Sequence, residues 1–326
     1  MSTTPTPPLG LVEKSRVLLA AGSAIVLFTT VGWAVAEPED PDMGVTLVVN
    51  WGRVLSVWPA LTALTAVAAV IGTVLAPRRL VEGGVFAAAV GLAGLALKGG
   101  SMQDLLGYVG TATAEGRRAL MARLALDTLL WTAVLLAAWV VVAVVRRWLW
   151  ADDRMYSSMP FTGSTEGESA PGAVAAEGPA TPAGVQPPGW PATIVTGLVA
   201  VFFIYLTVAR TPIAMVARGQ VIFSVGMGFY LGAMAGRYFT GVARSHWYLL
   251  AVPAAALLGY LIGYLNAGLG WAVGAWKPFA DLATTPPHAL VRPLPIEYLA
   301  VGVTATLIGF WSGEKMEHVT EPGTKA

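Results

Sequence analysis

The stretch SVGMGFYLGAMAGRYFTG, residues 224–241, places small residues at an unbroken spacing of four in an otherwise apolar run. These small residues are Ser224, Gly228, Gly232, Gly236 and Thr240. Residues four apart share one face of a helix. Glycine costs a helix in water about 1 kcal/mol relative to alanine, so the spacing indicates a helix whose backbone closely contacts another. Such stripes are typical of helices packed together in a membrane.

The composition of the whole chain agrees with a membrane setting. Of the 326 residues, 56% are hydrophobic and 12% are charged, and the mean hydropathy is +0.65. Soluble domains usually contain about 25% charged residues. The net charge of +1, without a basic stripe interleaved with aromatic residues, argues against a nucleic-acid partner. We therefore predict an all-α, polytopic integral membrane helical bundle that contacts the lipid bilayer.

Eight apolar runs are candidate transmembrane helices, because roughly 20 helical residues cross about 30 Å of hydrocarbon. We expect these spans near residues 17–36, 55–76, 82–97, 124–145, 193–209, 220–236, 247–267 and 297–312. Four fall in an N-terminal half, residues 1–150, and four in a C-terminal half, residues 191–326. The linker between the halves, residues 151–190, is rich in Gly, Pro, Ala and Ser, and it has too few large apolar residues to offset the entropy of ordering it.

Basic residues beside the span ends predict the orientation, because cytoplasmic loops tend to retain Lys and Arg. With the N-terminus inside, the pairs at 78–79 and 146–147 are cytoplasmic and the acidic run EPEDPD, residues 37–42, is outside. The basic residues that fall on the outer side are Arg117, Arg118, Arg123, Arg210 and Arg218. We expect a multi-pass protein of the cell (inner) membrane with both termini in the cytoplasm.

The N-terminal run has a second interpretation. A basic start, the apolar run VLLAAGSAIVLFTT and the tripeptide AVA before Glu37 also describe a cleaved secretory signal. The apolar run from Val17 to Ala36 is long for a signal, so we expect an uncleaved first span. Cleavage before Glu37 would leave seven spans with the same orientation.

The sequence offers no recognisable catalytic or metal-binding motif. Cysteine is absent, which excludes disulfides, thiolate metal sites and thiol catalysis. His246, His288 and His318 lie far apart without a partner at ligand spacing, and no phosphate-binding glycine loop, GxSxG or HExxH motif is present. We therefore predict no catalytic, cofactor-binding or metal residue, and we expect a protein that is not an enzyme.

Ionisable residues within or beside spans are candidate functional groups, because burying them in a membrane is costly. Asp127 lies about one turn inside the fourth span, four residues after Arg123. We interpret these two as an interfacial ion pair, with a gate or substrate contact as the alternative, and the same alternatives hold for Glu297 after Arg292. Asn266 suits an interhelical hydrogen bond or, alternatively, a water-filled vestibule. The Arg-then-acid order in both halves resembles the parallel repeats of transporters, although the residue match is too weak to establish duplication.

Two outer segments, residues 98–123 and 268–295, are long enough to fold over one face of the bundle. They mix apolar residues with charges and helix breakers, so we expect any ligand or partner to bind there. The polar candidates on this face are Arg117, Arg118, Lys277, Asp281 and Arg292.

The seventh span repeats the small-residue spacing of the sixth. Its stripe consists of Ala251, Ala255, Gly259, Gly263 and Ala267. Because the two helices are consecutive and a short loop joins them, we predict that their stripes pack against each other. Oligomerisation through one stripe and a flexible gating helix are the alternatives.

These observations predict a non-catalytic membrane subunit or scaffold that contacts a protein partner, or a second copy of itself, through outer loops and the linker. The alternative is a small-solute transporter or channel built from two four-span halves. A continuous polar path would favour transport, and a close-packed, dry bundle would favour the scaffold.

Overall fold

The structure is a computed structural model that describes residues 10–38, 40, 43–49, 53–109, 113–150, 188–208, 218–268 and 288–320. Every regular element in these residues is a helix. Most of the linker, residues 151–187, lies outside the described residues, as do Arg210, Lys277 and Asp281.

The described residues of the first half form four long helices and one short one. An N-terminal helix runs through α1 (Leu11–Leu27), the π-helical turn η1 (Phe28–Gly32) and α2 (Trp33–Ala36); α3 (Val54–Leu75), α4 (Gly83–Lys98), α5 (Met102–Val109) and α6 (Ala114–Leu149) follow. The hydroxyls of Thr29 and Thr30 donate to carbonyls four residues earlier, at 2.8 and 2.6 Å. Such side-chain bonds compete with the backbone ladder, which agrees with the π-helical turn at this place.

The second half is also helical. Its elements are α7 (Trp190–Thr207), α8 (Arg218–Thr240), α9 (Ser245–Leu249), α10 (Ala251–Leu265), the 3-10 turn η5 (Ala289–Val291), the π-helical turn η6 (Glu297–Val301) and α11 (Gly302–Thr320). The last two are continuous, so Glu297 opens the final helix.

Six of these helices, counted within the described residues, are long and apolar enough to cross a membrane. They are Leu11–Ala36, Val54–Leu75, Ala114–Leu149, Trp190–Thr207, Arg218–Thr240 and Ser245–Leu265. Large apolar side chains on the bundle's surface are widely exposed, for example Leu198 at 65% and Phe202 at 64%. Lipid accepts such surfaces whereas water does not, so the chain is a multi-pass membrane protein.

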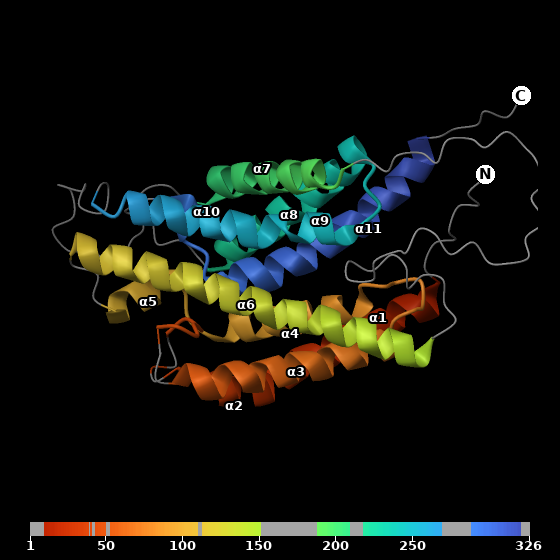
Figure 1. The fold of residues 1–326 in the computed structure, drawn as a ribbon, viewed down its shortest axis with the longest axis horizontal. Coiled ribbons are helices and arrows are strands. Elements are labelled where there is room, and N and C mark those ends of the chain that lie inside the picture. Colours follow the sequence, from red (N-terminus) through yellow and green to blue (C-terminus); the bar gives the residue numbers. More distant parts are fainter. Residues whose placement is uncertain are drawn as a thin grey trace, which may run out of the picture.

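Figure 1 shows the long helices running along the longest axis in two groups, α1 to α6 and α7 to α11, with α10 beside α6. We name the two ends of the bundle after residues of α6. At the Arg117 end, segment 43–49 meets segment 288–296, where Gly44 lies against the side chain of Leu294. At the Arg146 end, the turns at 76–82 and 241–244 join neighbouring helices.

The small-residue stripe of α8 faces α7 and not α10. A Cβ atom added at Gly232 would lie 2.5 Å from the carbonyl oxygen of Thr196, and one at Gly228 would lie 3.0 Å from that of Ala200. One at Gly236 would lie 2.7 Å from the Thr196 hydroxyl. The prediction that the sixth and seventh spans pack stripe against stripe is therefore wrong.

The physical reason is that α7 carries a small-residue stripe of its own. Its buried residues include Ala192, Thr196 and Ala200, which are again four apart. Two flat surfaces permit a close backbone approach, and α10, which also carries a stripe, uses Gly259 and Gly263 against Leu290 and Met121 instead. Ser224, at the start of the α8 stripe, is buried and donates to the Gln220 carbonyl of its own helix at 2.6 Å.

The stripe of α10 faces the irregular segment 288–296 and α6. A Cβ atom at Gly259 would lie 2.5 Å from the carbonyl oxygen of Leu290, and one at Gly263 would lie 2.8 Å from the sulfur of Met121. Ala255, one turn before Gly259, is also buried. The missing side chains on α10 thus leave room for segment 288–296 at the Arg117 end.

Candidate functional site

Asp127 is buried inside the bundle, with 1% of its surface exposed. Its Oδ1 atom accepts a hydrogen bond at 2.9 Å from the backbone N–H of Leu47, in the irregular segment 43–49. The indole N–H of Trp131, one turn later, and the backbone N–H of Val48 also act on this carboxylate. The hydroxyl of Thr46 is buried without a hydrogen-bond partner among the described residues.

Arg123 does not pair with Asp127. Arg123 is exposed, whereas the carboxylate one turn later points inward to Leu47. Residues four apart on a helix differ by about 40° around its axis, which here separates an exposed side from a buried one. The interpretation of these two residues as an interfacial ion pair is therefore wrong.

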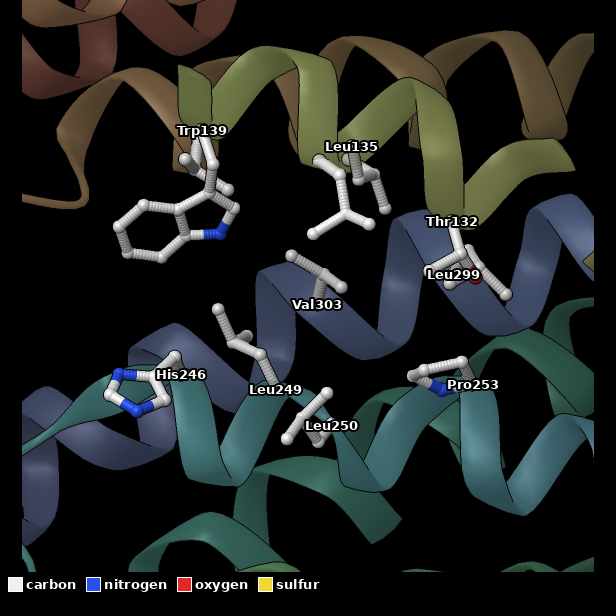
Figure 2. A pocket seen from close by; sticks show the side chains of 11 residues that line it. Thr132, Leu135, Trp139, His246, Leu249, Leu250, Pro253, Leu299 and Val303 are labelled. Atoms are coloured by element: carbon white, nitrogen blue, oxygen red, sulfur yellow. The ribbon is translucent and has the colours of Figure 1, made fainter. Parts of the chain in front are cut away.

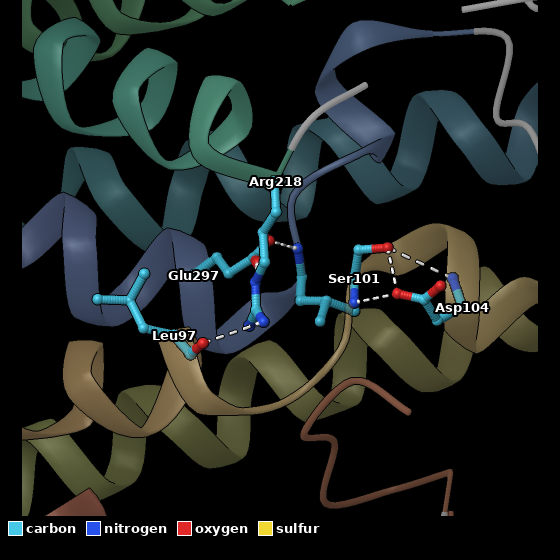
Figure 3. A network of polar contacts seen from close by, with 6 residues as sticks. Leu97, Ser101, Asp104, Arg218 and Glu297 are labelled. Carbon is cyan, nitrogen blue, oxygen red and sulfur yellow. Dashed lines mark hydrogen bonds and ion pairs between the residues drawn. The ribbon is translucent and has the colours of Figure 1, made fainter. Parts of the chain in front are cut away.

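Glu297 is equally buried, with 1% of its surface exposed, and it occupies a junction between the halves. Its Oε1 atom lies 3.3 Å from Nε of Arg218, and its Oε2 atom accepts the backbone N–H of Leu294 at 2.8 Å. Arg218 also donates to the carbonyl of Leu97 at 3.2 Å, which ties the start of α8 to the end of α4 (Figure 3). The junction thus joins both halves of the chain.

A serine–aspartate pair lies near this junction at the start of α5. Asp104 accepts hydrogen bonds from the backbone N–H and the hydroxyl of Ser101, at 2.7 and 2.6 Å (Figure 3). A carboxylate at a helix start satisfies donors that have no partner inside the helix. Asp104 therefore has a local capping role.

Two buried tyrosines hold the backbone of segment 288–296. Tyr260 donates to the carbonyl of Pro293 at 2.7 Å, and Tyr298 donates to that of Leu290 at 2.9 Å. Their rings are 6.4 Å apart and nearly perpendicular. This irregular backbone can lie inside the bundle because side chains satisfy polar groups that no regular helix pairs.

Four further polar candidates lie at the Arg117 end of the bundle. Asn266 is exposed and donates to the Ile262 carbonyl of its own helix at 3.0 Å. Arg117 is buried and donates to the carbonyl of Ala267 at 2.6 Å, whereas Arg118 is exposed. Arg292 is buried too, and burial lowers the pKa of its guanidinium.

His288 precedes segment 288–296 and has a local role. Its Nδ1 atom accepts the backbone N–H of Leu290 at 3.3 Å, which starts the turn η5. Burial lowers the pKa of its imidazole, because a charged ring loses hydration. Within the described part of the chain, no three His, Asp or Glu side chains come together in a way that would hold a metal ion.

The sequence did not reveal Arg218, Trp131 or the segment 43–49 as parts of this site. Arg218 entered only as an exception to the expected charge bias. A cation on the outer side of a span is unusual, and Glu297 was already a candidate buried carboxylate in the second half. These two observations together could have predicted the pair between Arg218 and Glu297.

Comparison of this chain with protein-family models, with curated proteins and with solved structures finds no match. The functional argument therefore depends on the geometry alone.

Proposed function

We propose that the protein is a non-catalytic membrane subunit or scaffold, with eight spans in two four-span halves and both termini in the cytoplasm. The two helices beyond the six long apolar ones are α4 and the helix that Glu297 opens. Helix α4 has 16 residues, or about 24 Å at 1.5 Å per residue, which is short for a span. Most of its residues are buried, so protein surrounds it and its length need not match the lipid.

The observation that carries the proposal is how the two buried acids are used. Asp127 and Glu297 each bind a backbone N–H of an irregular segment, and Glu297 also pairs with Arg218. A solute path would need such groups to face a cavity with water and polar partners. A cavity of about 240 Å³ between the two halves is instead lined almost wholly by apolar side chains. This arrangement supports a dry bundle.

The orientation is supported by the charges at the two ends of the bundle. The basic pairs at 78–79 and 146–147 lie together, since Arg146 donates to the carbonyl of Arg78 at 2.7 Å. Cytoplasmic ends of spans retain such residues. The exposed cations Arg118 and Arg123 at the other end weaken the bias, while Arg117 and Arg218 there are engaged with Ala267 and Glu297.

The test of a subunit or scaffold is isolation from its native membrane. A tagged chain is cross-linked in cells, solubilised in mild detergent and analysed for bound proteins. We expect one protein in a fixed ratio to the chain, or a defined homo-oligomer, and reduced recovery when residues 157–187 are replaced by Gly and Ser. A monomer without a partner at native expression would contradict the proposal.

A small-solute transporter or channel is the second candidate, and one observation favours it. Asp127 is an ionisable residue buried inside a long apolar helix, and no cation forms an ion pair with it among the described residues. Intramembrane ionisable groups often mark ion or proton paths. Proton or ion flux in liposomes that Asp127→Asn abolishes, with normal folding, would favour this candidate over the scaffold.

A further inference from the structure

An apolar cleft of about 240 Å³ opens on the flank of the bundle between α6 and the α9–α10 pair. Figure 2 shows Trp139 and His246 at one end of the cleft and Thr132 and Pro253 at the other. Leu299 and Val303 of the last helix form part of its buried floor. The cleft therefore lies where the two halves of the chain meet.

The rim of this cleft faces the surroundings of the helices and not an end of the bundle. Leu136 on α6 is 46% exposed, and Leu250 between α9 and α10 is 48% exposed. Leu136 lies well inside one long apolar helix and Leu250 lies near the start of another, and the outer surface of such helices contacts lipid. Lipid chains are therefore the molecules that meet the opening.

Water is a poor occupant of the cleft. A water molecule needs two to four polar partners, and only Thr132, Trp139 and His246 among the lining residues carry a polar side-chain atom. The Thr132 hydroxyl already donates to the carbonyl of Thr128 at 2.7 Å. The cleft thus suits an apolar chain.

The cleft extends from within the leaflet at the Arg146 end to the bilayer centre. At about 1.5 Å per residue, Trp139 lies about 10 Å from Arg146 along α6, and Thr132 lies about 21 Å from it. Half of the hydrocarbon core is about 15 Å thick. An acyl chain that enters from the Arg146 end would therefore run past Trp139 and His246 towards the bilayer centre.

The charges beside the entrance favour an anionic head group. Arg147 follows Leu136 by three helical turns, so it lies on the side of α6 that bears the rim, and Arg244 precedes His246 by two residues; both arginines are exposed. The acids at this end whose side chains are described face other groups. Glu13 pairs with Arg79, and Glu82 accepts from the Trp311 indole.

We propose that this cleft binds one acyl chain of an anionic phospholipid from the leaflet at the Arg146 end, with its net negative head group attracted by Arg147 and Arg244. The bound acyl chain fills the space between α6 and α10 and so stabilises the contact between the two halves. This inference does not depend on the proposed protein partner.

The test uses the full chain in nanodiscs of phosphatidylcholine that contain a photoactivatable phospholipid with a diazirine on one acyl chain. The probe has either a phosphatidylglycerol or a phosphatidylcholine head group, and adducts are mapped by mass spectrometry. We expect adducts within residues 132–139 and 246–253, with the phosphatidylglycerol probe favoured about 30-fold, the scale of attraction from two arginines at about 1 kcal/mol each. Equal yields from both probes, or adducts outside these segments, would overturn the proposal.

Matched variants test the two parts of the site. Leu136→Trp should block the cleft and remove the adducts, whereas Leu129→Trp, two turns away on the same helix face, should leave them unchanged. The double variant Arg147→Gln and Arg244→Gln should lower phosphatidylglycerol labelling to the phosphatidylcholine level, whereas Arg118→Gln with Arg123→Gln should not. If Leu136→Trp fails to fold, the arginine pair decides the question, and unchanged labelling there contradicts the proposal.

Discussion

The carboxylate of Asp127 accepts a hydrogen bond at 2.9 Å from the backbone N–H of Leu47, a residue 80 positions earlier. The bond is buried, and it fastens the irregular segment 43–49 to α6. Glu297 does the same for segment 288–296 through Leu294, at 2.8 Å. In both places an acid satisfies a backbone donor that has no helical partner.

The first prediction concerns this anchoring by Asp127. Asp127→Ala leaves the Leu47 N–H unpaired, and a buried unpaired donor costs about 1–3 kcal/mol. Asp127→Asn should cost less, because the amide oxygen still accepts the bond. Thermal unfolding in detergent measures both, with the exposed Arg123→Gln as the control that should match the parent. Equal stability of the alanine variant and the parent would refute the anchoring role.

The second prediction concerns the Arg218–Glu297 pair. Arg218→Gln leaves Glu297 buried without its cation, and loss of one partner of a buried pair costs about 3–5 kcal/mol. Glu297→Gln should be milder, because it removes the buried charge and keeps an acceptor for Leu294. In the double variant the two costs should not add. Additive costs in a double-mutant cycle would show that the 3.3 Å contact carries no coupling.

The third prediction compares two glycines of α8. Gly232→Ala would place a Cβ atom 2.5 Å from the Thr196 carbonyl oxygen, and overpacking of this kind costs about 1–3 kcal/mol. Gly226→Ala meets only Val301, at 3.5 Å, and should be neutral or stabilising because alanine favours the helix by about 1 kcal/mol. The melting temperatures of the two variants measure this difference in stability. A Gly232→Ala protein as stable as the Gly226→Ala protein would contradict the close α7–α8 contact.

The fourth prediction concerns the spans themselves. Single cysteines are introduced at Leu80 and Ser101, on either side of α4, and at Gly178 and Arg118. An impermeant maleimide should label positions 101 and 118 in intact cells, and it should label 80 and 178 only after the membrane is opened. Labelling of 80 and 101 from the same side would mean that α4 does not cross the bilayer.

Helix positions followed closely from the apolar runs. The runs at 55–76 and 82–97 correspond to α3 (Val54–Leu75) and α4 (Gly83–Lys98). The run at 124–145 is only the apolar part of α6, which begins at Ala114 because the helix continues through a charged first turn. Apolarity therefore marked where a helix can lie in lipid but not where the helix ends.

Helix partners and the polar site did not follow from the sequence. The sequence predicted the α8 stripe but not the helix that the stripe faces. The matching residues of α7, Ala192, Thr196 and Ala200, are not glycines and so do not form a recognisable glycine motif. The link from Asp127 to Leu47 spans 80 residues and involves a backbone donor, which leaves no mark in side-chain patterns.

The central claim is that the bundle interior is closed to water, and cysteine accessibility tests it most directly in this cysteine-free chain. Single cysteines replace Thr46, Thr128 and Thr306, which are all buried, and the exposed Arg118 and Arg244 serve as controls. In opened native membranes, an impermeant maleimide should label the two controls and leave the three buried positions unmodified. Labelling of Thr128→Cys or Thr306→Cys at a rate comparable with the controls would reveal a water-filled path and contradict the account.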